Sequence, residues 1–447
     1  MANQSSASEL GTDTIGSLLF RYSIPSIIAM TASSLYNVVD RIFIGQGVGP
    51  LAISGLAITL PVMNLGVAFG ALVGAGAATL VSIRLGEKQD YEAVRILGNT
   101  TVLNLILSLS YSIVMLIFLE PILLFFGASE ETLPYAKDFM QIILYVNVVL
   151  HTYMGFNNVM RASGYPRKAM GATLLTVVVN VILAPIFIFV FGWGIRGAAL
   201  ATACAMFPSF IYTVVHFLNK KHTVAFAKGT FGLDKKIIID IFSIGMSPFV
   251  INFCACIITI FINKQLVEWG GDYAVGAFGI INSVSMCVIM TVLGLAQGMQ
   301  PIAGYNYGAK QYERVRSVFK KSVLVATCIT TIGFLAAELF PREIAVAFTN
   351  SLDIIEPTLT GMRIVFILYP LIGFYIIVSN LFQSIGKAKL SVILSLSRQT
   401  FYLAPGLIAF PMFFGVNGVW IALAVADIAC VLTALMMYKT QIGKILV

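Results

Sequence analysis

Residues 33–44 read SSLYNVVDRIFI and place an acidic side chain, Asp40, inside the first long apolar stretch of the chain. A carboxylate at membrane depth costs about 2.5–3.5 kcal/mol on insertion scales, so it is a functional candidate by default. Tyr36 and Asn37 precede it by four and three residues, which puts all three side chains on one helical face. The alternative is an acid that only pairs with a basic neighbour. Arg41 suits that role poorly, because adjacent helical residues point in different directions.

The composition indicates a membrane protein. The chain has 447 residues, of which 58% are hydrophobic and only 11% are charged, whereas soluble proteins average about 25% charged residues. A membrane-spanning helix needs about 20 mostly apolar residues. Twelve such runs can be read from the sequence: 17–44, 51–83, 94–119, 134–160, 169–191, 197–218, 237–266, 273–303, 317–340, 357–384, 390–414 and 416–438. The prediction is an all-α integral membrane protein with twelve transmembrane helices.

The charges of the loops predict the orientation. Lysines and arginines gather in alternate loops, as in 84–95, 161–168 and 219–236, while the loops between them carry mostly acids, such as Glu130 and Glu131. Because positive loops stay on the cytoplasmic side, both termini are expected in the cytoplasm. The net charge of +8 is therefore a sign of topology, and no nucleic-acid partner is expected.

The two halves of the sequence resemble each other. Gly86, Gly164 and Gly197 stand in loops that recur around Gly308, Gly386 and Gly418, at offsets of 222, 222 and 221 residues. Parallel repeats of this kind place a substrate path between the halves. The predicted organisation is an N-terminal segment (1–16), an N-lobe (17–218), a basic linker (219–236), a C-lobe (237–440) and a tail (441–447). The two lobes are predicted to be pseudo-symmetric, with six helices each.

Polar and methionine side chains recur within the spans and are candidates for substrate binding. They are Tyr36, Asn37, Met63, Asn147, His151, Asn157, Asn158, Met290, Gln297 and Gln300. The competing interpretation is that such groups join helices to one another. His151 is a candidate proton carrier or a hydrogen-bonded structural residue. Pro25 is a predicted bend in the first span, since proline removes a helical hydrogen bond. Arg398 and Asp427 lie in the last two spans, and we expect them to form a structural pair.

Several motifs together resemble those of the multidrug and toxic compound extrusion (MATE) transporters, over nearly the whole chain. They are YNVVDRIFIG at 36–45, GPLAISG at 49–55, RASG at 161–164 with KAM at 168–170, NVIL at 180–183 before PIFIF at 185–189, and GIRGAA at 194–199. The resemblance is strongest to the bacterial branch of MepA-like and DinF-like proteins. It implies a multi-pass protein of the bacterial cytoplasmic membrane. It also implies export of amphipathic or cationic drugs by antiport with inward H⁺ or Na⁺.

The resemblance also implies a coupling site in the N-lobe, formed by Asp40, Asn180 and Thr202. Members of the family usually have a second acid four residues after the asparagine, but this chain has Ala184 there. This departure weakens a Na⁺ site at Asp40, Asn180 and Thr202. Either these oxygens still bind Na⁺, which prefers oxygen ligands as other hard cations do, or Asp40 carries protons alone.

Two other classes of transporter fit the sequence less well. A lipid-precursor flippase of the same superfamily would be expected to line its cavity with several cations, and Arg41 and Arg398 are the main ones at depth. A major-facilitator transporter usually has a motif rich in aspartate and arginine in the loop after its second span, and the corresponding loop of this chain does not fit that motif well. No catalytic constellation or metal motif is apparent, so an enzyme is not expected. The expected partners are small-molecule drugs and membrane lipids, the expected state is a monomer, and no cofactor beyond the coupling ion is expected.

Overall fold

The computed structural model describes residues 8–349 and 351–445, and every regular element in them is a helix. The predicted terminal segments 1–16 and 441–447 therefore lie partly outside the described residues. The helices are α1 (Glu9–Thr12), α2 (Ile15–Gly47), α3 (Pro50–Gly86), α4 (Asp90–Ile117), α5 (Leu119–Phe125), α6 (Leu133–Ala162), α7 (Pro166–Pro185), η1 (Ile186–Val190), α8 (Gly194–Leu218), α9 (Lys235–Gly308), α10 (Tyr312–Leu339), α11 (Pro341–Phe348), α12 (Leu352–Phe366), α13 (Tyr369–Ser384), α14 (Ala388–Leu396), η2 (Ser397–Leu403), α15 (Ala404–Phe414) and α16 (Val416–Ile445).

These helices account for the predicted spans. Among the described residues ten helical stretches are long and apolar enough to cross a membrane, and α12 with α13 forms an eleventh, bent by 54°. The predicted span 390–414 is made of α14, the π-helix η2 and α15, which follow one another without a gap. α9 contains two spans, because Gly271 has the non-helical angles φ 65° and ψ −169°.

The backbone repeats the duplication seen in the sequence. Positive φ angles occur at equivalent points of the two halves, where the chain turns between helices. The pairs are Gly49 (117°) with Gly271 (65°), Lys88 (60°) with Lys310 (58°), Gly164 (103°) with Gly386 (72°), and Gly194 (56°) with Gly415 (57°). Left-handed angles are rare for residues other than glycine. Their recurrence at Lys88 and Lys310 therefore indicates that both turns have the same geometry.

The helices group into two compact units. Unit 1 contains residues 8–13 and Ile28–Asn252, and unit 2 contains Thr14–Ile27 and residues 253–445. Both α2 and α9 thus contribute one part to each unit. Pro25 and Pro248 lie just before two of the three positions where the chain passes from one unit to the other. α2 continues through Pro25 as one helix.

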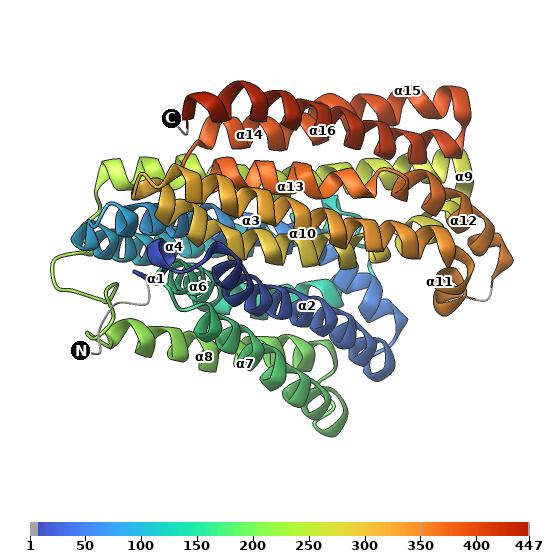
Figure 1. Cartoon of the computed structure of the whole chain (residues 1–447). Helices are drawn as coiled ribbons and strands as arrows, with labels where there is room; N and C mark the ends of the chain where they lie inside the picture. Colours follow the sequence, from blue (N-terminus) through green and yellow to red (C-terminus); the bar gives the residue numbers. More distant parts are fainter. Residues whose placement is uncertain (1–7, 350, 446–447) are drawn as a thin grey trace. The chain divides into compact units, whose positions relative to one another are not determined.

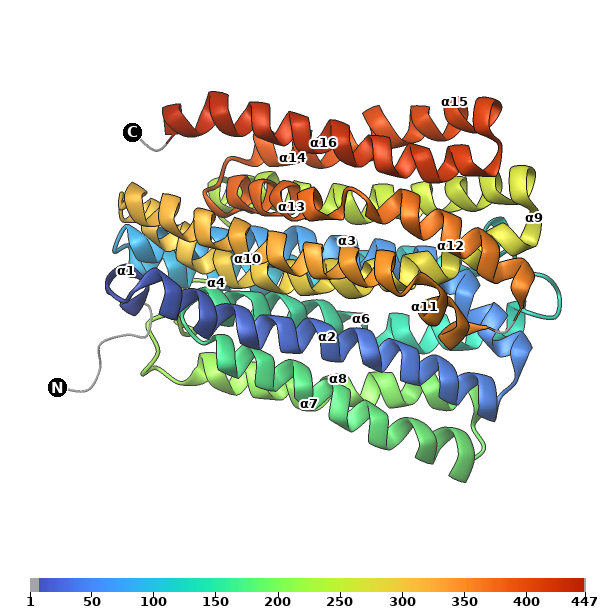
Figure 2. The same ribbon diagram turned by 45° about the vertical axis from the view of Figure 1, so that its right-hand side comes forward.

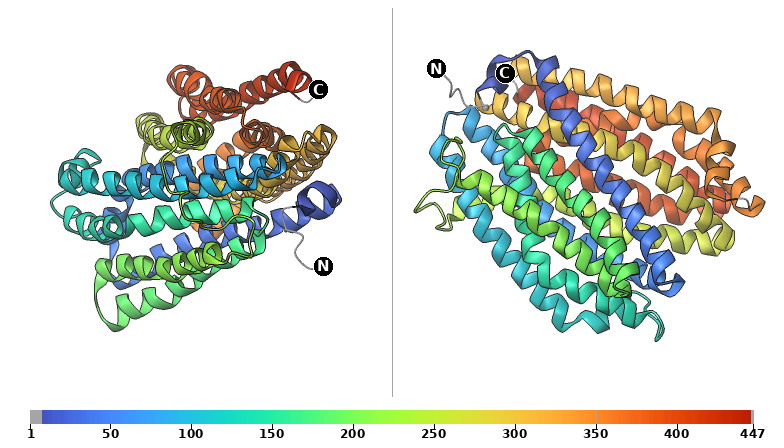
Figure 3. Two further views of the ribbon diagram at one scale, coloured as in Figure 1. Left: turned by 90° about the vertical axis from the view of Figure 1, so that its left-hand side faces the viewer. Right: turned by 90° about the horizontal axis from the view of Figure 1, so that it is seen from below.

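Unit 1 is built around α6. This helix packs against α3, α4 and α8, and α7 packs against α8 (Figures 2 and 3). Much of its core is made of small or branched side chains, including Ala52, Ala136 and Ala198. Small residues let helix backbones approach closely, which is the main way that helices pack in membranes.

In unit 2, α10 packs along α13, and α15 packs along α16 (Figure 1). α16 also contacts α12, α13 and η2. Trp420, in the first part of α16, is completely buried. Its ring lies 6.3 Å from that of Phe278 in the second half of α9, with the two rings stacked.

Candidate functional site

Two of the three predicted coupling residues, Asn180 and Thr202, contact each other in unit 1, and Asp40 lies one helical turn from a residue that contacts Thr202. Asn180 on α7 donates a hydrogen bond from its amide nitrogen to Thr202 Oγ1 on α8, at 3.1 Å. The Tyr36 hydroxyl of α2 lies 3.4 Å from the same Thr202 oxygen. Asp40 follows one turn after Tyr36 on α2 and is 93% buried, with 7% of its surface exposed. The Asp40 Oδ1 atom has no hydrogen-bond partner in the described part of the chain.

The local sequence explains this geometry. Tyr36 and Asp40 are four residues apart, so both project from one side of α2. Asn180 lies in the last part of α7, which ends at Pro185 and passes into η1. Ala184 is completely buried in the hydrophobic core of unit 1, together with Ile44 and Ile188. In the MATE transporters that the sequence resembles, this position usually carries an acid. Here it carries a methyl group that packs among apolar side chains.

The group formed by Tyr36, Asp40, Asn180 and Thr202 is chemically suited to a proton or a hard cation. It supplies carboxylate, hydroxyl and amide oxygens, which are the ligands that hard cations prefer. An unpaired buried carboxylate oxygen is costly, and a proton or a cation would remove that cost. Over the residues that the structure describes, no set of three or more His, Cys, Asp or Glu side chains is arranged to hold a metal ion.

The predicted residues of the fourth span face other helices. Asn147 is buried and donates from its amide nitrogen to the Ser108 carbonyl at 3.3 Å and to Ser112 Oγ at 3.2 Å, both on α4. His151 is also buried, and its ring lies 6.3 Å from that of Tyr111. Its Nε2 atom has no hydrogen-bond partner among the described residues. His151 therefore retains an unused polar atom inside unit 1, whereas the amide nitrogen of Asn147 is occupied.

Asn157 and Asn158 lie near the end of α6, next to Arg161. The Asn157 amide donates to the Ala169 carbonyl at 2.8 Å, and Arg161 donates to Asn158 Oδ1 at 3.0 Å. Both asparagines thus make contacts that connect or stabilise helices. Their predicted role in substrate binding stays a prediction.

The other candidates are spread over both units. Asn37 is exposed and donates to the Ser33 carbonyl at 2.8 Å. Met63 is half-buried against the core of unit 1, where it accepts a weak hydrogen bond from Thr59 at 3.6 Å. In unit 2, Met290, Gln297 and Gln300 are half-buried along the second part of α9.

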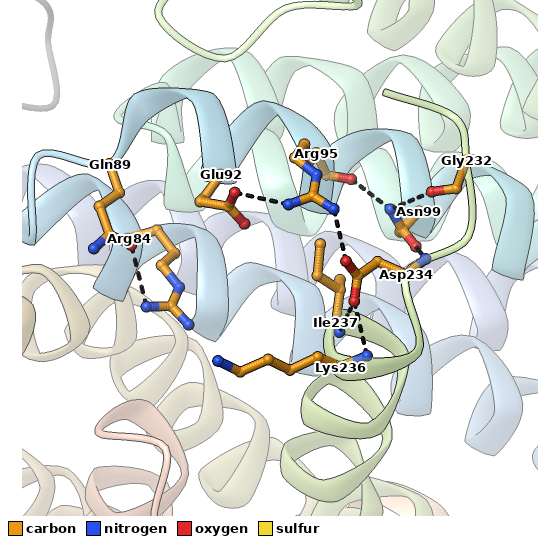
Figure 4. Close-up of polar contacts among 9 residues, drawn as sticks. All are labelled: Arg84, Gln89, Glu92, Arg95, Asn99, Gly232, Asp234, Lys236 and Ile237. Atoms are coloured by element: carbon orange, nitrogen blue, oxygen red, sulfur yellow. Dashed lines mark hydrogen bonds and ion pairs between the residues drawn. The ribbon is translucent and has the colours of Figure 1, made fainter. Parts of the chain in front are cut away.

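A charged cluster at one end of unit 1 was not predicted from the sequence. Arg95 donates to Glu92 at 2.8 Å and to Asp234 at 2.6 Å, and Asn99 bonds the backbone of Gly232 and of Asp234 (Figure 4). Asp234 also caps the first turn of α9 by accepting the N–H groups of Ile237 and Lys236. Those two bonds, with a smaller contribution from Arg95, hold the pKa of Asp234 below its usual value.

This cluster borders a cavity of about 340 Å³ between the end of α3, the start of α4 and the start of α9. The feature of the sequence that could have indicated this cluster is Asp234, which stands directly before a helix, because aspartate is a common capping residue. The contact fastens the linker 219–236 to α4. We call Arg95, Asn99 and Asp234 the linker clamp.

The family and its relatives agree with this architecture. The MatE family model matches residues 25–186 and 244–407. The chain is 26% identical to the multidrug export protein MepA of Staphylococcus aureus (strain MSSA476) over 419 residues, which cover 94% of this chain and 92% of the relative. It is also 26% identical to MepA of Staphylococcus haemolyticus (strain JCSC1435) over 425 residues, covering 93% and 92%.

Solved structures confirm the fold. An outward-facing multidrug resistance MATE family transporter of the MOP superfamily superposes with a TM-score of 0.94 at 24% identity, covering 100% of this chain and 99% of that one. A MOP superfamily transporter from Pyrococcus furiosus gives the same values. The predicted family and the predicted all-helical fold are therefore confirmed. Since the family model matches most of both halves, the chain belongs to the MatE family of membrane transporters.

Proposed function

We propose that the protein is a secondary active antiporter that exports structurally diverse amphipathic or cationic drugs in exchange for inward H⁺ or Na⁺. The names of its relatives support export of drugs, since the proteins similar to it over most of its length are called multidrug export proteins. In this proposal the protein lies in the bacterial cytoplasmic membrane as a monomer with both termini in the cytoplasm. The repeats 17–218 and 237–440 act as two lobes that alternate the access to the substrate.

One observation carries the coupling part of the proposal. Asp40 is 93% buried, its Oδ1 atom has no hydrogen-bond partner among the residues that the structure describes, and it lies one turn from the Tyr36–Thr202–Asn180 contact. A carboxylate that must bind and release an ion in each cycle needs an oxygen that is not already occupied by a hydrogen-bond donor. A permanently paired carboxylate would have no free energy to gain from binding the ion.

The test is transport by the purified protein in proteoliposomes under separately imposed pH and Na⁺ gradients, with ethidium as the drug. We expect one of the two imposed ion gradients to drive ethidium transport by wild type. Asp40→Asn should lose this response to the ion gradient. Asp353→Asn is the matched control, because Asp353 is exposed near the start of α12. Equal gradient-driven transport by Asp40→Asn and wild type would remove Asp40 from the coupling mechanism.

A further inference from the structure

The cavity next to the linker clamp is bordered by charged side chains that the clamp does not use. It lies in unit 1, where the stretches Leu51–Gly86, Asp90–Ile117 and Lys235–Gly271, all long enough to span a membrane, each have one end. Its volume of about 340 Å³ is at the small end of the range for ligand pockets, about 300–1,000 Å³. The cavity therefore has room for a small polar group at the membrane surface.

Two of the charges that line the cavity, Lys236 and Asp240, have no partner. By contrast, Arg398 and Asp427 form their expected pair, with Arg398 Nε donating to Asp427 Oδ1 at 2.8 Å. Lys236 and Asp240 stand four residues apart on α9, in the order that is less favourable for a helical ion pair. Among the described residues, neither the Lys236 ammonium nor the Asp240 carboxylate makes a hydrogen bond or an ion pair. The cavity thus presents one free charge of each sign.

The Arg84 side chain adds hydrogen-bond donors beside Lys236. Its Nη1 atom donates to Glu87 Oε2 at 2.7 Å and to Gln89 Oε1 at 3.2 Å, while its Nε and Nη2 atoms bond nothing in the described part of the chain. The Lys236 side chain extends toward this guanidinium (Figure 4), and two cations that border one cavity repel each other. An oxyanion between them would remove this repulsion, and phosphate is a group that arginine and lysine both bind.

The acids of the lining make a purely anionic ligand unsuitable. The lining contains three cations and three acids, namely Arg84, Arg95, Lys236, Glu92, Asp234 and Asp240. Arg95 already pairs with Glu92 and with Asp234, so the half-buried Asp240 is the acid that remains free. A ligand with only negative charge would be repelled by this carboxylate, whereas a ligand that carries both a phosphate and an ammonium would satisfy both free charges.

The apolar part of the lining indicates that such a ligand has an apolar portion as well. Leu80 precedes Arg84 by one turn of α3, and Ile96 follows Glu92 by one turn of α4, so both lie further into their spans than the charged residues. Both are buried. The lining thus changes from charged to apolar toward the interior of the spans. A phospholipid has the same order of groups, and pockets between spans are known to bind lipid headgroups.

We propose that this cavity binds a phosphoethanolamine group, as carried by the zwitterionic phospholipid phosphatidylethanolamine. The phosphate lies between Arg84 and Lys236, and the ammonium donates to the Asp240 carboxylate. The bound group joins the end of α3 and the start of α4 to the start of α9, beside the linker clamp. The inference does not depend on which compound is exported, since none of these residues belongs to the proposed coupling or substrate sites.

The test measures binding of short-chain lipids to the purified full-length protein by native mass spectrometry. Dihexanoyl phosphatidylethanolamine carries both groups, and dihexanoyl phosphatidylglycerol carries the phosphate without the ammonium. We expect wild type to bind the first about tenfold more tightly. Lys236→Gln should weaken both lipids about twofold to fivefold, because its ammonium is exposed. Lys235→Gln is the matched control, because Lys235 is exposed but does not line the cavity, and it should change neither affinity.

Asp240→Asn removes the acceptor for the ammonium, so it should abolish the preference for phosphatidylethanolamine without weakening phosphatidylglycerol. Wild type that binds both lipids equally, or Lys236→Gln that behaves like Lys235→Gln, would overturn the inference. The comparison of the two lysine variants remains decisive even if Asp240→Asn does not fold, because the Lys236 ammonium makes no contact in the described chain.

Glycerophosphoethanolamine, the headgroup without acyl chains, distinguishes the source of the ligand. If it displaces the bound lipid at equal concentration, the site accepts the phosphoethanolamine group from a soluble phosphodiester. If it does not, the acyl chains are needed and the ligand is the phospholipid. Both results support recognition of the phosphoethanolamine group, provided that the lipid preference of wild type and the effect of Lys236→Gln are as expected.

Discussion

Gly245 marks the closest approach between two helices of unit 1, and replacing it tests how the first part of α9 is held there. A Cβ atom added at Gly245 would lie 1.7 Å from the Leu72 carbonyl oxygen of α3. The reverse contact is similar, since a Cβ at Gly76 would lie 2.1 Å from the Ile241 carbonyl oxygen. Real Cβ atoms stay at least 3.0 Å from such atoms, so Gly245→Ala must move the two backbones apart by at least about 1.3 Å.

The size of the effect follows from two opposing contributions. Over-packing a tight contact costs typically about 1–3 kcal/mol, and the atoms in the way belong to the Leu72 backbone, which cannot rotate away. Alanine in place of glycine within a helix recovers up to about 1 kcal/mol. The net expectation for Gly245→Ala is a loss of about 1–2 kcal/mol of stability. Gly279, also on α9, is the matched control, because its Cβ would meet nothing within 4 Å. Gly279→Ala should be neutral or stabilising by up to about 1 kcal/mol.

The assay is thermal unfolding of the purified variants in the same detergent, followed by intrinsic fluorescence and by recovery of the monodisperse peak. We expect the apparent unfolding temperature to rank Gly279→Ala at or above wild type and Gly245→Ala clearly below it. Adding Gly76→Ala to Gly245→Ala should cost less than the sum of the two single changes, because both act on one contact. A Gly245→Ala protein as stable as Gly279→Ala would refute the reasoning that the helices touch through their backbones.

The other predictions concern the coupling site and the linker clamp. Ala184→Asp should add a second carboxylate one turn after Asn180 on α7 and change the dependence of ethidium transport on pH and Na⁺ gradients, and an unchanged dependence would contradict our interpretation of this position. Arg95→Gln and Asp234→Asn should each lower thermal stability slightly, with less than additive loss in the double variant, because the pair is half-exposed; strict additivity would argue against the clamp. Because the pKa of Asp234 is lowered in the folded protein, its contribution to stability is complete above its unfolded pKa of about 4 and is lost as the pH falls through the folded value. Acidification below about pH 4 should therefore destabilise wild type more than Asp234→Asn, and parallel acid unfolding curves would count against this assignment.

The spans and the duplication could be predicted because both leave local signals in the sequence. A transmembrane helix must satisfy its own backbone and present apolar side chains for about 20 residues. Recurring turns also need residues that accept positive φ, and Gly164 and Gly386 satisfy that need at the predicted offset. Such signals need no knowledge of which helices are neighbours.

The contacts between distant segments could not be predicted in this way. Arg95 and Asp234 are 139 residues apart, and nothing near either residue specifies the other. The same holds for Asn147, whose amide proves to bind α4. Polar side chains within spans look alike in sequence whether they bind substrate or join helices, so only the packed structure distinguishes them. The unpaired Asp40 oxygen is likewise a property of the packing.

If Asp40 is the single coupling carboxylate, as we propose, the driving force for export depends on the charge of the substrate. If Asp40 carries one proton inward while one monovalent cation leaves, no net charge moves, and only the pH difference drives export, at about 1.4 kcal/mol per unit. For a substrate without net charge, the same proton would enter as the only charge moved. The membrane potential would add roughly 2.3 kcal/mol per 100 mV for that substrate. A transporter with one coupling carboxylate would therefore export substrates without net charge against a steeper concentration gradient than monovalent cations when the membrane is energised.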